Sequence, residues 1–87
     1  MPRHEWFLGP EAALALRSIP RRSADSVLRL IASLADNPDC PADEEFHRGR
    51  RDFIRVKQFD SWRITWWIDA PVKEIQILAI EKVRRSR

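Results

Sequence analysis

The chain has little of several residues on which common kinds of site depend. Its 87 residues include one cysteine, Cys40, which cannot form an internal disulfide, and no tyrosine. Only two glycines, Gly9 and Gly49, are present, too few for the glycine-rich loop that binds phosphates. No apolar run approaches the roughly 20 residues that span a bilayer, and the first residues lack the apolar stretch of a secretory signal. We therefore expect a cytoplasmic protein with no membrane segment.

Metal-binding residues are equally sparse. The only histidines are His4 and His47, and their spacing with Cys40 is not that of a metal site. No Ser-His-Asp or Cys-His arrangement of a nucleophilic enzyme can be read from the sequence either. We expect neither a metal ion nor another cofactor.

What remains is the composition of one small globular domain over residues 1–87. The chain is 44% hydrophobic and 33% charged, which is typical of a folded protein rather than a disordered one. Its charge is uneven, because residues 1–45 carry a net charge of −3 and residues 46–87 a net charge of +6. Polyanions and acidic proteins are the usual partners of such a basic half.

Two helices are predicted in the acidic half. Gly9-Pro10 stops a short aromatic strand at 4–8 and starts a helix over 11–19, since proline favours the first helical position. Apolar residues at helical spacing predict a second helix over 21–36, which ends at Asn37-Pro38. The connection between them is so short that the helices must form a hairpin.

The basic half is predicted to form strands. An acidic connector and a basic, glycine-containing approach, 39–45 and 46–52, precede three strands at 53–58, 62–69 and 74–80. Short loops make the three strands antiparallel neighbours. The order β-α-α-β-β-β predicts an α+β fold, in which a small antiparallel sheet of three to four strands carries the N-terminal helical hairpin on one face.

Three cations lie on two of these strands. Alternation puts Arg55 and Lys57 on one face of their strand, and Ile54 and Val56 on the other. In the next strand, Trp62, Ile64, Trp66 and Ile68 form the apolar face, opposite Arg63, Thr65, Trp67 and Asp69. We expect Ile54 and Val56 to face the helices. Arg55, Lys57 and Arg63 would then share the uncovered face as a phosphate-reading or phosphate-cleaving surface.

The whole pattern resembles the RelE/ParE superfamily of toxins from bacterial type II toxin–antitoxin modules. The resemblance covers nearly the whole chain, in order and spacing. It rests on Trp6-Phe-Leu, the helices ending at Asn37-Pro38, Phe53-Ile-Arg-Val-Lys57, Trp62-Arg-Ile-Thr-Trp-Trp-Ile-Asp69, and Ile75-Gln-Ile-Leu-Ala-Ile80 followed by a basic segment. It implies a toxin whose partner is an acidic, partly disordered antitoxin. RelE-like toxins cut mRNA on the ribosome, and ParE-like toxins poison DNA gyrase.

The resemblance and the chemistry together assign roles. RNA cleavage without a metal needs a base, cations near the developing phosphorane, and an acid. The family's catalytic cations match Arg55, Lys57 and Arg63, with Lys57 as the candidate base. Expected RNA contacts come from Trp67 by stacking, from His47, and from one of Lys82, Arg84 and Arg85.

We expect the first of three activities and keep the other two as alternatives. A ribosome-dependent mRNA endonuclease is favoured by the three strand cations. A ParE-like gyrase inhibitor, or a non-catalytic nucleic-acid-binding or degenerate module, is favoured by the missing tyrosine and the lack of a clear acid. The sequence favours the endonuclease, because clustered cations suit phosphoryl chemistry and a protein-binding surface would carry more apolar area.

Overall fold

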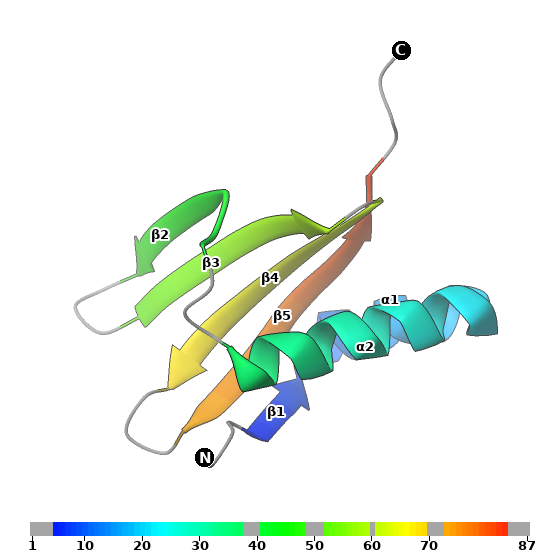
Figure 1. Ribbon diagram of the computed structural model, residues 1–87, viewed down its shortest axis with the longest axis horizontal. Helices are drawn as coiled ribbons and strands as arrows, with labels where there is room; N and C mark the ends of the chain where they lie inside the picture. The colour runs from blue at the N-terminus through cyan, green and yellow to red at the C-terminus, as the bar shows by residue number, and fades with distance from the viewer. Residues whose placement is uncertain (1–4, 38–40, 49–51, 60, 70–72, 84–87) are drawn as a thin grey trace.

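The chain folds into one mixed sheet and two helices. The computed structural model describes residues 5–37, 41–48, 52–59, 61–69 and 73–83, leaving aside the side chains of residues 47, 48, 52 and 53. Figure 1 shows both helices on the same side of the sheet, which agrees with the predicted α+β class and helical hairpin. The elements in chain order are β1 (Glu5–Leu8), α1 (Pro10–Ser18), α2 (Arg21–Asp36), β2 (Glu44–Arg48), β3 (Asp52–Phe59), β4 (Trp62–Asp69) and β5 (Glu74–Lys82).

The sheet is larger than the sequence predicted. It has five strands in the order β1-β5-β4-β3-β2, and β1 pairs with β5 in parallel, whereas every other pair is antiparallel. The additional strand is β2, which takes in residues that we expected in the connector and the basic approach. Glu44, Glu45 and Phe46 are all exposed in β2. An edge strand with both faces exposed has no apolar alternation, so the pattern that reveals strands was absent.

The core lies between the helices and the middle of the sheet. Four residues of α2 at helical spacing are buried, Val27, Ile31, Leu34 and Ala35. They belong to one cluster with the apolar face of β4, whose Trp62, Ile64 and Trp66 are buried as predicted. We call this side of the sheet the helix face. The other side, to which neither described helix packs, is the open face.

A bulge in β5 changes which of its residues reach the core. Simple alternation would place Ala79 with Ile75 and Ile77, and Ile80 on the other face. The pairing with β4 shifts between Thr65 and Trp66, so that Thr65 opposes Ala79 while Trp66 opposes Ile77. An extra residue in one strand exchanges the faces beyond it. Ile80 is therefore buried on the helix face.

The turn before β5 holds a strained residue. Lys73 has φ of 55°, the left-handed region that disfavours side chains with a Cβ atom. We expect Lys73→Gly to raise the free energy of unfolding by about 1 kcal/mol, because glycine occupies this region without a steric penalty. Urea denaturation would measure the change. Lys82→Gly, at the last position of β5, is the control and should lower stability. A destabilised Lys73→Gly variant would contradict the prediction.

Candidate functional site

The register between β3 and β4 separates the three predicted cations. Residues directly opposite each other in an antiparallel pair lie on the same face. Arg55 opposes Trp66 and Lys57 opposes Ile64, so both cations lie on the helix face. Arg63 opposes Gln58 and lies on the open face. The prediction that Arg55, Lys57 and Arg63 share one uncovered face is therefore wrong, and so is the expectation that Ile54 and Val56 face the helices.

The length of the β3–β4 turn is the physical cause. Phe59 opposes Trp62, so only residues 60 and 61 lie between the paired positions. We had expected Phe59 inside the loop, which would shift the register by one residue. Because side chains alternate with period two, a one-residue shift moves every side chain of a strand to the other face.

Lys57 and Arg55 are held by contacts on the helix face. The Lys57 Nζ donates to the carbonyl oxygen of Pro41 at 2.9 Å and lies 5.7 Å from the ring centre of Phe59. Arg55 Nη2 lies 3.3 Å from Glu45 Oε2, and the Arg55 side chain is 19% exposed. These contacts fix both cations beside the helices.

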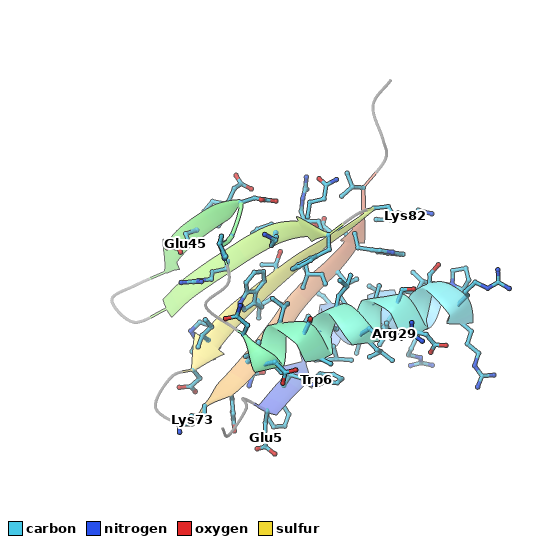
Figure 2. All side chains as sticks on the ribbon, in the orientation of Figure 1. Glu5, Trp6, Arg29, Glu45, Lys73 and Lys82 are labelled. Carbon is cyan, nitrogen blue, oxygen red and sulfur yellow. The ribbon has the colours of Figure 1, made fainter. Side chains whose placement is uncertain are left out.

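A basic groove runs between α2 and the turn end of the β3–β4 hairpin, at Phe59 and Trp62. Its two parts are separate pockets of about 420 Å³ and about 170 Å³, the second beside the end of α2, and they share Phe59 in their lining. Arg22 and Arg29 line the first, and Lys57 lines the second. Figure 2 shows Arg29 on α2 and Lys82 at the far end of β5. The remaining lining residues of the two parts are Ser23, Ser26, Leu30, Ser33, Leu34, Asn37, Ser61 and Trp62.

Sequence reasoning missed Arg22 and Arg29 as members of this groove. Both are exposed, at the border of the apolar stripe of α2. Positions 22, 26 and 29 follow helical spacing, which is the signal that was available. An apolar stripe by itself indicates only a core-facing surface, so it does not predict that the polar residues beside it line a groove.

The open face carries a row of side chains across the sheet that is apolar except for Gln76 on β5. Phe46, Ile54, Trp67, Gln76 and Phe7 oppose one another in succession, from β2 at one edge to β1 at the other. Phe46 is 49% exposed and Phe7 is 43% exposed, whereas Trp67 is half-buried. Of the predicted site residues, Trp67 and Arg63 lie on this face.

The other predicted site residues are Lys82, His47, Arg84 and Arg85, and the structure describes the side chain of Lys82 alone among them. Lys82 opposes Trp62 on the helix face, with its Nζ 5.9 Å from the Trp62 ring centre. His47 in β2 opposes Phe53 in β3, but the His47 side chain lies outside the described part of the structure. Arg84 and Arg85 lie entirely outside it. Within the described residues, no group of three or more His, Cys, Asp or Glu side chains could hold a metal ion. No described helix is long and apolar enough to cross a membrane.

Solved structures share this fold. The RelE–RelB complex of the archaeon Pyrococcus horikoshii superposes with a TM-score of 0.76 at 16% identity, covering 98% of this chain and 100% of that chain. The RelBE2 toxin–antitoxin complex of Mycobacterium tuberculosis gives 0.75 at 17% identity, covering 93% and 99%. The isolated RelE toxin of E. coli gives 0.72 at 12% identity, covering 97% and 88%. No protein-family model and no curated protein matches the chain. At these identities the likeness establishes that the chain has the RelE fold.

Proposed function

We propose that the chain is the toxin component of a toxin–antitoxin module. The observation that carries this proposal is the extent of the structural likeness, which covers nearly all of this chain and of the toxins it resembles. Two of those toxins were solved together with their antitoxins. A likeness that spans the full length leaves little of the chain for an unrelated purpose.

The basic groove supports an acidic antitoxin as the partner. Arg22, Arg29 and Lys57 supply positive charge along it, while Phe59 and Leu30 supply apolar surface. An amphipathic helix laid into a groove needs both, because apolar anchors give affinity and charges set orientation. The antitoxin segment would place carboxylates against the arginines and apolar side chains against Phe59.

Binding to a protein target is the activity that the geometry favours over RNA cleavage. Metal-independent cleavage needs several cations around one phosphate. Of the three predicted catalytic cations, Arg63 alone lies on the open face, and the neighbouring surface is apolar. Apolar and aromatic surface is characteristic of protein interfaces. A gyrase-type target belongs to this class. Ribosome-dependent mRNA cleavage is the second candidate, supported by Arg63 and Trp67 on one face.

Inducing expression of the chain in bacterial cells tests both the toxin assignment and the proposed binding activity. We expect growth arrest, relieved by an acidic protein encoded in an adjacent reading frame that co-purifies with the chain. We expect mRNA 5′ ends on translating ribosomes to stay unchanged, because the cations are divided between two faces. Supercoiling by gyrase is assayed in parallel.

The outcomes separate the two activities. Codon-phased cuts that disappear in Arg63→Ala, while Arg17→Ala on α1 still cuts, would establish the endonuclease and overturn the binding activity. Absence of growth arrest together with absence of an acidic partner would overturn the toxin assignment itself.

A further inference from the structure

The open face combines exposed aromatic side chains with an acidic border. Phe46 and Phe7 mark the two ends of this largely apolar row, with Ile54, Trp67 and the polar Gln76 between them. A largely apolar surface of this kind, bordered by polar groups, is typical of an interaction site. The row crosses five strands spaced about 4.8 Å apart, so it is about 19 Å long.

Carboxylates lie on both sides of this row. On one side, Glu74 opposes Asp69 on β4 and Glu5 on β1, so three carboxylates occupy neighbouring strands on the open face. On the other side, Glu44 opposes Val56, and Glu81 opposes Arg63. Among the described side chains, the positive charges near the row are Arg63 and Lys73, in the turn before β5. The border is therefore acidic.

The three neighbouring carboxylates lower the stability of the isolated chain. Like charges directly opposite each other on neighbouring strands destabilise a sheet. One of the three, Glu74, accepts a long hydrogen bond of 3.5 Å from the Gln76 side chain. A cationic partner would offset the repulsion, which gives the complex an advantage that the free chain lacks.

We propose that the open face is a docking surface for a basic amphipathic helix of a partner protein. One turn of helix rises about 5.4 Å, close to the spacing between strands, so a helix lying along the row would present one apolar side chain to each strand. About 13 residues would cover the 19 Å row. Lysine or arginine side chains flanking the apolar stripe would reach the carboxylates of Asp69, Glu74 and Glu44. The basic groove beside α2 selects the opposite charge, so the two surfaces take different partners. This inference rests on the proposed binding activity, which uses the same face, and it adds the charge and the secondary structure of the partner segment.

Synthetic peptides and the purified full chain test the proposal. A labelled leucine–lysine peptide of helical period is compared with a leucine–glutamate peptide that has the same leucine positions, and with a scrambled leucine–lysine peptide. Fluorescence anisotropy measures the affinities. We expect the helical basic peptide to bind at least tenfold more tightly than either of the others, with an affinity that falls as salt is raised.

Matched variants locate the binding. Phe46→Ser and Glu74→Lys should each weaken binding about tenfold or more. Leu14→Ser and Glu11→Lys, both on exposed positions of α1, are the controls and should leave the affinity unchanged. Circular dichroism checks that each variant is folded.

Several results would overturn the proposal. They are equal binding of the acidic peptide, no binding of the basic peptide, or equal losses in the control variants. A dimer in sedimentation analysis that Phe46→Ser dissociates would assign the face to a second copy of the chain. Preferential binding of single-stranded RNA that Phe46→Ser abolishes would assign it to nucleic acid.

Discussion

Trp66→Ala should unfold a large fraction of the protein, with a loss of about 3–5 kcal/mol in the free energy of unfolding. Trp66 is completely buried, in the cluster that joins α2 to β4 and β5. Its removal would leave a large cavity in this cluster, and a close-packed core closes such a cavity only in part. Because small domains are stable by about 5–15 kcal/mol in total, this single change takes much of that margin.

Urea denaturation followed by circular dichroism measures the loss, and two further variants calibrate it. Trp66→Phe keeps an aromatic ring and removes a buried indole N–H that has no hydrogen-bond partner among the described residues, so it should cost less than half as much. Leu14→Ala should cost under about 0.5 kcal/mol, since Leu14 is 62% exposed. Equal losses for Trp66→Ala and Leu14→Ala would contradict the assigned core.

Reversing two charges in the basic groove should nearly abolish antitoxin capture. Arg22 and Arg29 line the larger part of the groove from α2. Arg22→Glu combined with Arg29→Glu replaces two attractions with two repulsions, for which we expect an affinity loss on the order of a hundredfold. Calorimetry with the acidic protein from the adjacent reading frame measures the loss. The difference in affinity between the double variant and the unaltered chain should become much smaller at high salt, because these side chains are exposed.

A control of equal net charge separates the groove from the general field of the protein. Arg17→Glu combined with Arg21→Glu changes the same total charge on exposed positions that do not line the groove. This pair should weaken binding by only a few-fold. If both double variants weakened binding equally, the antitoxin would be attracted by net charge without occupying the groove.

Most helices and strands could be predicted from the sequence because the apolar residues of their buried faces recur at regular spacing. The α2 stripe and the alternation of Trp62, Ile64 and Trp66 both reflect burial on one face, which period alone reveals. Strand β2 could not be read, since its exposed Glu44, Glu45 and Phe46 carry no such pattern.

The arrangement of the candidate site was harder to predict than the fold. Alternation determines the two faces of each strand separately, whereas the turn determines how the faces of neighbouring strands correspond. Because Phe59 belongs to β3 and not to the turn, Lys57 lies opposite Ile64 rather than Arg63. The bulge beside Thr65 had the same effect on Ile80. The three cations do lie on β3 and β4 as predicted, but the single shared surface predicted for them is wrong.

The parallel pairing of β1 with β5 constrains when the protein can finish folding during its synthesis. Of the described strands, β1 leaves the ribosome first and β5 leaves it last, and these two hydrogen-bond to each other, with Glu5 opposite Glu74 and Leu8 opposite Ile77. Until β5 has emerged, Trp6 lacks Ile75 opposite it and β4 lacks its second neighbour. Contacts between such distant parts of a chain form late and slowly. A nascent chain therefore cannot complete this sheet before β5 has been synthesised and has left the ribosome.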